Sequence, residues 1–419
     1  MMKTKLGIMA LITFFGLALF LSPSAHAQVV RGEGLLEAGP QPRGTTPPVS
    51  LFPSWFMDKN GLALEPCLDG PPLCLSSLAA FSNPDVGEAF YWSASANLRH
   101  PSGANGLVEF ALEAAFLNPA QTQRNAMVFN RLRIRIDALT ADGRYTMVHP
   151  FGQHVFATEP DPKGGFRINT TIDLPGAAGP GSFNGVLRAP NIGPFLRQAN
   201  APAGHLGSPN LFRPVTGGPN GNSITITGPG GFTMTANQFA VEGKIATNGG
   251  LTRARASYSR DATGAGTLNV FASSIGQQRI VAVRPLQTRV RLKPVAGQIG
   301  NYSAVIPFTA TQTFEPLTVR NLTDASKPFQ TFDTVADLVT ITEATFTPGT
   351  APGAPGTLTV RANSSDLLVP RPRLELTDGS GNVLQTGRGR ISLVLRTPIN
   401  PGTVRVTSTA GGRDSANVP

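Results

Sequence analysis

The feature that most constrains this chain is a long succession of short segments in which apolar and polar residues alternate. The clearest is VFNRLRIRID at 128–137, where Leu132, Ile134 and Ile136 fall on one face of an extended chain. Successive side chains of a strand point to opposite faces, so this spacing predicts a strand that is buried on one side only. Similar segments recur, separated by many of the 46 glycines and 37 prolines. We therefore predict an all-β protein of antiparallel sheets joined by turns.

The strand segments divide the chain after the N-terminal region into three units. Residues 51–222 form the first, and it ends in a long irregular stretch at 178–222, which we interpret as a functional loop or a link. Residues 223–335 form the second unit. Residues 336–419 carry strands spaced about ten residues apart, with a hairpin at LELTDGSGNVLQ. The prediction is two antiparallel β-sandwich-like domains followed by a small immunoglobulin-like β-sandwich.

The N-terminus has the pattern of a secretory signal peptide at residues 1–27. Lys3 and Lys5 precede an apolar run of about 16 residues, and Ala25-His26-Ala27 forms an A-x-A cleavage signal. The run is short for a spanning helix, which needs about 20 residues, although an uncleaved anchor is the alternative. Residues 28–50 are rich in proline and glycine, and we predict a flexible leader. We expect a secreted or periplasmic protein with no transmembrane segment in its mature form.

Cys67 and Cys74 are the two cysteines of the chain. In an oxidising compartment such a pair is typical of a disulfide, and the LDGPPL between them favours a chain reversal that brings the sulfurs together. A redox-active pair is more often C-x-x-C, and a metal site needs further ligands. We predict a structural disulfide, with free thiols or a reactive pair as the alternatives.

Two histidines flank a turn-like sequence in YTMVHPFGQHVFATEPD. If PFGQ is a hairpin loop, His149 and His154 face each other across a strand pair, where opposed Cβ atoms lie about 5 Å apart. With Glu159 or Asp161 as a further ligand they would form a Zn²⁺ or Cu²⁺ site. The alternative is a polar cross-strand pair with no metal.

Arginine recurs at every second position in three rows, and the formal net charge is +10. The rows are Arg131, Arg133 and Arg135; Arg253 and Arg255; and Arg289 and Arg291 with Lys293. Each row projects from one strand face, so adjacent rows would bind anionic polysaccharide or cell-envelope polymer. The alternative is a set of separate solvated faces. Aromatic residues do not interleave with the rows as single-strand binding requires, so we expect no specific nucleic-acid partner.

The sequence contains none of the common catalytic motifs. It lacks the nucleophile elbow G-x-S-x-G, the P-loop and the dinucleotide fingerprint, so we expect no cofactor. Glu109 and Glu113 share a strand face, and we interpret them as solvated surface acids. A carboxylate pair that hydrolyses polysaccharide is the alternative.

Several blocks of the sequence resemble a group of uncharacterised secreted bacterial proteins. The blocks are FPSWFMDKNGLALEPCLDGPPLC, GEAFYWSA, RLRIRIDAL, YTMVHPFG, IGPFLR, VTGGPNGNSITITGPGG and NQFAVEGKI, and the DLVTITEATF…TLTVRANSS tail resembles the immunoglobulin-like module that closes such chains. The resemblance implies the three-unit layout, an exported location and a hairpin motif at His149-Pro150. It implies no catalytic residues.

These observations favour a secreted, non-catalytic binding or structural protein of the cell surface or extracellular matrix. Anionic polymer is the candidate ligand, and the arginine rows and the 178–222 stretch are the candidate sites. An extracellular polysaccharide-active enzyme with an accessory immunoglobulin-like domain, or a periplasmic metal-binding protein, is the alternative. The oligomeric state is left open.

Overall fold

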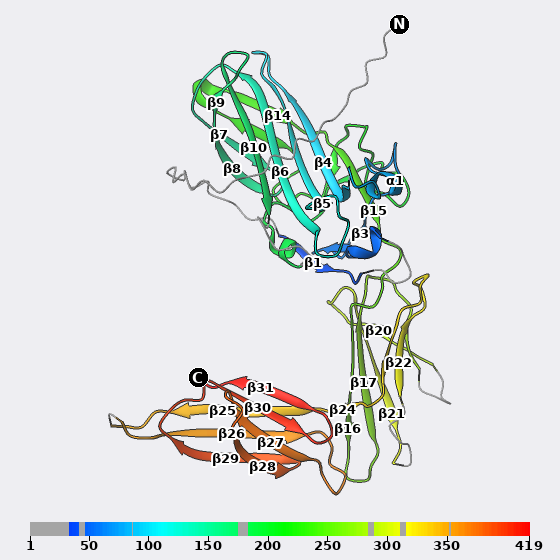
Figure 1. Cartoon of the computed structure of the whole chain (residues 1–419), viewed down its shortest axis with the longest axis vertical. Helices are drawn as coiled ribbons and strands as arrows, with labels where there is room; N and C mark the ends of the chain where they lie inside the picture. The colour runs from blue at the N-terminus through cyan, green and yellow to red at the C-terminus, as the bar shows by residue number, and fades with distance from the viewer. Residues whose placement is uncertain are drawn as a thin grey trace.

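The computed structural model describes residues 33–41, 47–85, 87–174, 183–283, 289–310, 316–351 and 353–419, so the predicted signal peptide at 1–27 lies outside the described residues. The described chain contains one short α-helix and three 3₁₀ helices: α1 (Leu78–Phe81), η1 (Val49–Leu51), η2 (Gly185–Arg188) and η3 (Pro229–Gly231). Strands form most of the rest, in three β units that follow one another (Figure 1). The all-β prediction is confirmed. In this part of the chain no helix is long and apolar enough to cross a membrane.

The first unit packs a nine-stranded antiparallel sheet against a four-stranded one. The large sheet contains, in spatial order, β1 (Leu35–Ala38), β2 (Phe56–Asp58), β3 (Ala63–Glu65), β15 (Ala240–Ile245), β4 (Ala89–Arg99), β5 (Asn105–Phe116), β6 (Ala126–Leu139), β10 (Phe166–Leu174) and β9 (Glu159–Pro160). The small sheet contains β14 (Thr233–Ala236), β13 (Ile224–Thr227), β7 (Arg144–His149) and β8 (Gly152–Ala157). A separate pair is formed by β11 (Arg197–Gln198) and β12 (Val215–Thr216).

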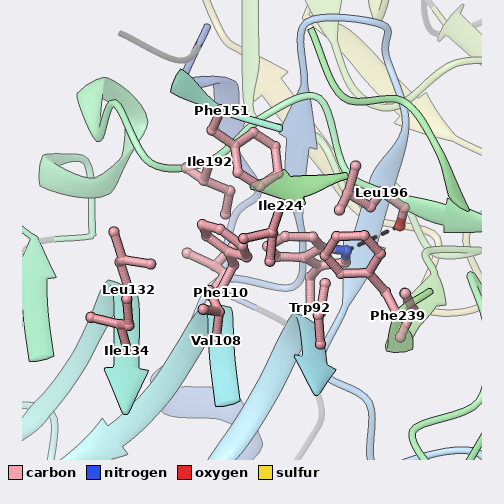
Figure 2. Close-up of a cluster of buried hydrophobic side chains, with 14 of the residues drawn as sticks. Trp92, Val108, Phe110, Leu132, Ile134, Phe151, Ile192, Leu196, Ile224 and Phe239 are labelled. Atoms are coloured by element: carbon pink, nitrogen blue, oxygen red, sulfur yellow. Dashed lines mark hydrogen bonds between the residues drawn. The ribbon is translucent and has the colours of Figure 1, made fainter. Parts of the chain in front are cut away.

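The core of the first unit lies between the two sheets. Trp92 of β4 and Phe110 of β5 point from the large sheet toward Ile224 of the small one (Figure 2). The indole nitrogen of Trp92 donates a hydrogen bond to the carbonyl oxygen of Leu196 at 3.2 Å, so the ring satisfies its single donor inside the core. Leu196 belongs to the predicted irregular stretch, and its side chain is fully buried. The described part of that stretch is therefore packed into the first unit.

The second unit is a smaller sandwich of a five-stranded and a four-stranded sheet. The first sheet contains β20 (Lys293–Pro294), β21 (Asn301–Phe308), β17 (Gly266–Ser273), β16 (Arg253–Arg260) and β24 (Ala336–Asp337), and only the β16–β24 contact is parallel. The second contains β19 (Val290–Arg291), β18 (Ile280–Val283), β22 (Leu317–Asn321) and β23 (Phe329–Phe332). Tyr258, Val270 and Val319 are among the side chains that fill its core.

The third unit is a seven-stranded sandwich, as predicted for an immunoglobulin-like module. One sheet contains β25 (Val339–Thr347), β26 (Gly356–Ser364) and β29 (Arg390–Thr397). The other contains β28 (Val383–Arg388), β27 (Arg373–Asp378), β30 (Thr403–Ser408) and β31 (Arg413–Asn417). The β27–β28 hairpin is the one predicted at LELTDGSGNVLQ.

Two predicted boundaries are wrong. The first unit extends beyond residue 222, because β13 and β14 belong to its small sheet and β15 pairs with β3 and β4 of its large sheet. The boundary with the second unit therefore falls between β15 and β16. The leader predicted at 28–50 is also wrong where the structure describes it, since β1 pairs with β2 and Leu35 is buried in the core. These strands pair with partners far away in sequence, which local periodicity does not reveal.

Candidate functional site

The first predicted arginine row lies on β6 and is largely neutralised by acids on the neighbouring strands. The guanidinium of Arg131 contacts Glu113 of β5 at 3.0 Å and Asp173 of β10 at 2.9 Å. Arg133 lies directly opposite Glu109 and contacts it at 3.0 Å. Arg135 is exposed and has no such partner among the described residues. The face of β6 is therefore a mixed-charge surface. The prediction of an arginine row available to anionic polymer is wrong for Arg131 and Arg133.

Glu113 is buried beneath this network, so its interpretation as a solvated acid is wrong. Its side chain is 1% exposed, and burial raises its pKa to about 8 because the loss of water outweighs the attraction of Arg131. Glu109, by contrast, is only partly buried in its ion pair. A row of alternating residues does not show which acid the neighbouring strands will cover.

The third predicted row does not exist as one face. Arg291 belongs to β19 and pairs with Val281, whereas Lys293 belongs to β20 in the opposite sheet. Leu292 between them is fully buried, because the chain crosses from one sheet to the other at this point. Arg289 is exposed and lies in no strand.

The second row lies on a different kind of surface. Antiparallel register places Arg255 of β16 opposite Phe271 of β17, which lies opposite Ser303 of β21, and Ser303 lies opposite Lys293. Directly paired residues share a face of the sheet, so a cation, an aromatic ring, a hydroxyl and a second cation form one row across four strands. The Arg255 guanidinium carbon lies 4.7 Å from the centre of the Phe271 ring, which is 37% exposed.

This surface is hollowed into a groove, which we call the arginine groove. It has a volume of about 420 Å³ and is lined by Arg253, Arg255, Phe271, Ala272, Ser273, Val295, Gln298, Asn301 and Tyr302. No acidic residue is among these lining residues, and within the described chain neither arginine has a carboxylate within ion-pair distance. Both guanidinium groups therefore present their donors to solvent.

The floor of the arginine groove carries neutral hydrogen-bonding groups. The Ser273 hydroxyl donates to the Asn301 side-chain oxygen at 2.8 Å, and the Asn301 amide donates to Gln298 at 3.4 Å. These groups retain further donors and acceptors, because a hydroxyl has two lone pairs and an amide has two N–H donors. The arrangement suits a ligand that combines anionic groups with hydroxyls.

His149 and His154 do come together, inside the core rather than at an open site. The hairpin turn is shorter than the predicted PFGQ, since His149 pairs with Gly152 and His154 with Met147. Nε2 of His149 lies 2.9 Å from Nδ1 of His154, and both rings are at most 2% exposed. Burial lowers the pKa of His149 to about 3 and also lowers the pKa of His154.

The hydrogen bonds of this pair determine its tautomers. The backbone N–H of Phe151 donates to Nδ1 of His149 at 3.2 Å, so neutral His149 carries its proton on Nε2 and donates it to His154. A metal would have to replace these bonds. Within the described residues, no third histidine, cysteine or carboxylate joins the pair in a metal-sized cluster. Glu159 instead contacts Arg167, and Asp161 accepts backbone hydrogen bonds from Lys163 and Ala138.

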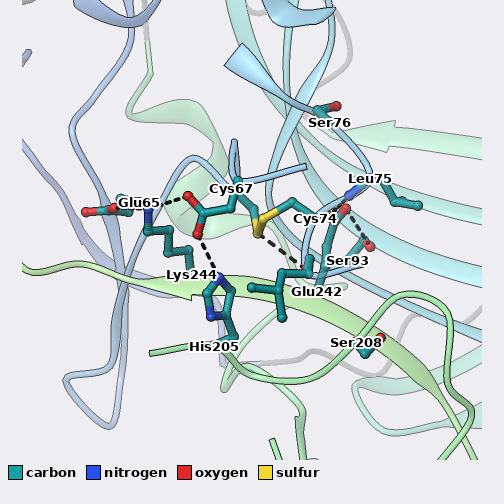
Figure 3. Close-up of a disulfide and its surroundings, with 12 residues drawn as sticks. Glu65, Cys67, Cys74, Leu75, Ser76, Ser93, His205, Ser208, Glu242 and Lys244 are labelled. Atoms are coloured by element: carbon teal, nitrogen blue, oxygen red, sulfur yellow. Dashed lines mark hydrogen bonds and ion pairs between the residues drawn. A yellow bond between two sulfur atoms is a disulfide. The ribbon is translucent and has the colours of Figure 1, made fainter. Parts of the chain in front are cut away.

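The predicted disulfide between Cys67 and Cys74 is confirmed. The disulfide is surrounded by His205, Glu242 and Lys244 (Figure 3). Glu242 is fully buried and accepts hydrogen bonds from the Leu75 N–H at 2.7 Å and from Ser93 at 3.1 Å, and burial raises its pKa to about 7. The sulfurs and His205 lie within 4.8 Å of one another, but the bonded sulfurs are not thiolate ligands. The disulfide-closed loop at residues 67–74 therefore has a structural role beside the buried Glu242.

The sequence pointed to Arg253 and Arg255 but missed the aromatic partner. Phe271 lies 16 positions after Arg255, on the next strand, so it is not interleaved with the arginines in sequence. Pairing the segments 253–260 and 266–273 as a hairpin about a short turn would have placed it there. The expectation that aromatics stand apart from the arginine rows is therefore wrong for this row.

Comparison with known proteins identifies no family. No family profile matches the chain, and no curated protein matches its sequence. A chimeric titin Z1Z2–Z1Z2 tandem functionalised with a GRGDS peptide from fibronectin matches at 14% identity, covering 41% of this chain and 96% of its own, with a TM-score of 0.19. A tetra-tandem repeat from the extending region of a large adhesion protein matches at 13% identity, covering 79% and 94%, with a TM-score of 0.20. Scores this low carry no argument, and the resemblance to secreted bacterial proteins stays a prediction.

Proposed function

We propose that this protein is an exported, non-catalytic binding or structural protein of the cell surface or extracellular matrix, and that its arginine groove binds anionic polysaccharide. The observation that carries the proposal is the pair Arg253 and Arg255, which have no carboxylate partner among the described residues and border an open groove with an exposed phenyl ring. Guanidinium groups bind carboxylate and phosphate through paired N–H donors, and the groove floor offers partners for hydroxyls. The signal-like N-terminus and the disulfide support export.

The proposal excludes catalysis as the role of the chain. Among the carboxyl groups and histidines of the first unit, Glu113, Glu242 and His149 have the largest pKa shifts, and each is at most 1% exposed. Polymer cannot reach these groups without local unfolding, and burial is the largest cause of each shift. Incubating the protein with hyaluronan and measuring chain length checks this, because an enzyme would shorten the polymer and a binder would not.

The test of binding is pelleting of the full chain on hyaluronan-coated beads at about 50 mM and about 500 mM salt. We expect retention at low salt and release at high salt. The double variant Arg253→Ala/Arg255→Ala should lose retention. The matched control Arg289→Ala/Arg291→Ala removes the same charge from the same unit and should retain it. Equal loss in both variants would show that net charge, and not the groove, holds the polymer.

A further inference from the structure

A second hollow adjoins the arginine groove at the junction of the first two units. It has a volume of about 180 Å³ and is lined by residues 36–40 of the first unit, by Asn184 and Leu187, and by Thr252 and Arg253. We call it the β1 hollow. Arg253 is a wall of both hollows, so they meet at this side chain. A ligand that fills both hollows would therefore contact residues of both units.

The two units are joined by buried hydrogen bonds beside these hollows. The indole nitrogen of Trp55 donates to the carbonyl oxygen of Gly249 at 3.0 Å, and the Gly250 N–H donates to Asp324 at 2.7 Å. Trp55 also packs with Met57 and Ile275, which come from the first and second units. A junction with a packed apolar cluster and these buried hydrogen bonds holds the two hollows in a fixed relation.

The charges of the two hollows differ. The arginine groove has two cations and no acid among its lining residues. The lining of the β1 hollow includes the half-buried Glu37 and the exposed Asn184 beside the shared Arg253. Glu37 forms no ion pair within the described chain, so its charge acts on whatever enters the hollow. The β1 hollow shares the single cation Arg253 and adds the acid Glu37, so an anionic unit is favoured less there than in the arginine groove, whereas a neutral sugar can donate hydroxyl hydrogen bonds to Glu37.

We infer that the ligand is an acidic polysaccharide in which charged units are separated by neutral ones, bound as one chain across both hollows. A uronate lies at Arg253 and Arg255, and a neutral sugar lies at Glu37 and Asn184. This inference rests on the proposed function of the arginine groove. It adds that the spacing of charge along the polymer determines which polymer binds.

The experiment compares two polymers by calorimetric titration of the full chain at low salt. Hyaluronan alternates a uronate with a neutral amino sugar, and polygalacturonate carries a carboxylate on every unit. We expect hyaluronan to bind more tightly. The variant Glu37→Gln should raise the affinity for polygalacturonate about threefold and leave that for hyaluronan equal or lower. Glu33→Gln is the matched control, since Glu33 is exposed nearby and does not line the hollow.

Each outcome separates the two proposals. If the Arg253→Ala/Arg255→Ala variant binds both polymers as the wild type does, the proposed function fails. If that variant loses both polymers, yet the wild type binds them equally and Glu37→Gln changes neither affinity, the proposed function stands and the charge-spacing inference is wrong. Asn184→Ala gives a second readout, because it should weaken the binding of hyaluronan while leaving the binding of a single uronate monosaccharide to the arginine groove unchanged.

Discussion

The arginines of β6 and those of β16 follow the same sequence pattern and reach opposite outcomes. On β6, Arg133 lies opposite Glu109, and Arg131 contacts two further acids. On β16, Arg255 lies opposite Phe271 and has no acid in reach among the described residues. The residue across the ladder thus decides whether an arginine stabilises the fold or remains available to a ligand. Residues that recur at every second position identify one face of a strand. The residues on the neighbouring strands then determine what that face can bind.

The largest expected effect is on the stability of the first unit. Arg131→Ala removes the half-buried guanidinium that contacts Glu113 and Asp173. Because Glu113 is mostly protonated at neutral pH, no bare charge is left behind, and we expect a loss of about 1–3 kcal/mol in the free energy of unfolding. Arg253→Ala removes an exposed side chain and should change it by less than about 0.5 kcal/mol. Urea denaturation of both variants makes the comparison. Similar losses in both would show that the two rows do not differ in structural role.

A second prediction concerns how the free energy of unfolding of the first unit depends on pH. Glu113 has a folded pKa of about 8 against an ordinary value of 4.5, so its contribution to stability is present below pH 4.5 and is lost as pH rises toward 8. Glu242 acts in the same direction up to about pH 7. His149 acts in the opposite direction, because its pKa falls from 6.5 to about 3 and its contribution is lost as pH decreases through that range.

Glu113→Gln should therefore gain stability relative to the wild type as pH is raised from 5 to 8. Denaturation midpoints at several pH values measure this change. Hyaluronan binding by the arginine groove should stay constant over the same range, since its described lining residues include no acid. A pH-independent difference between the variant and the wild type would mean that Glu113 is already charged in the folded protein at low pH.

A substitution on β17 can give the arginines of β16 the kind of acidic partner that those of β6 have. Phe271→Glu places a carboxylate opposite Arg255 in the register that Glu109 has opposite Arg133. We expect it to neutralise Arg255 and to weaken hyaluronan binding about tenfold. Phe271→Gln removes the ring without adding charge, and it should weaken binding less. Equal losses would assign the effect to the missing phenyl ring.

The smallest effect is expected at Arg135. This residue is exposed and has no ion pair in the described chain, so Arg135→Ala should leave both the free energy of unfolding and hyaluronan retention within error of the wild type. Denaturation and bead pelleting check the two quantities. A clear loss of retention would reveal a second anionic site on β6.

The sequence correctly predicted several features that depend only on residues close together in the chain. Strand periodicity at Leu132, Ile134 and Ile136, the two cysteines separated by turn formers, and the β27–β28 hairpin all depend on neighbouring residues, and each was predicted correctly. The failures concern pairing at long range. β15 joins β3 and β4 across more than a hundred residues, so the first boundary was placed too early.

The candidate site shows the same limit. Both groove arginines were found from their spacing, whereas the groove itself requires the register of β16, β17 and β21. The burial of Glu113 and of the histidine pair was also invisible, because it depends on which segments cover each sheet. The sequence alone indicates which side chains share a strand face, whereas the pairing of distant strands determines which residues lie beside them.

The two tryptophans of the chain occupy places that make them separate optical reporters. Trp92 lies in the core of the first unit, whereas Trp55 donates to Gly249 at the junction with the second unit. A chain with Trp92→Phe would therefore emit from the junction alone, and one with Trp55→Phe from the core alone. Fluorescence of the two variants under denaturant or applied force would then distinguish the parting of the first two units from the melting of the first.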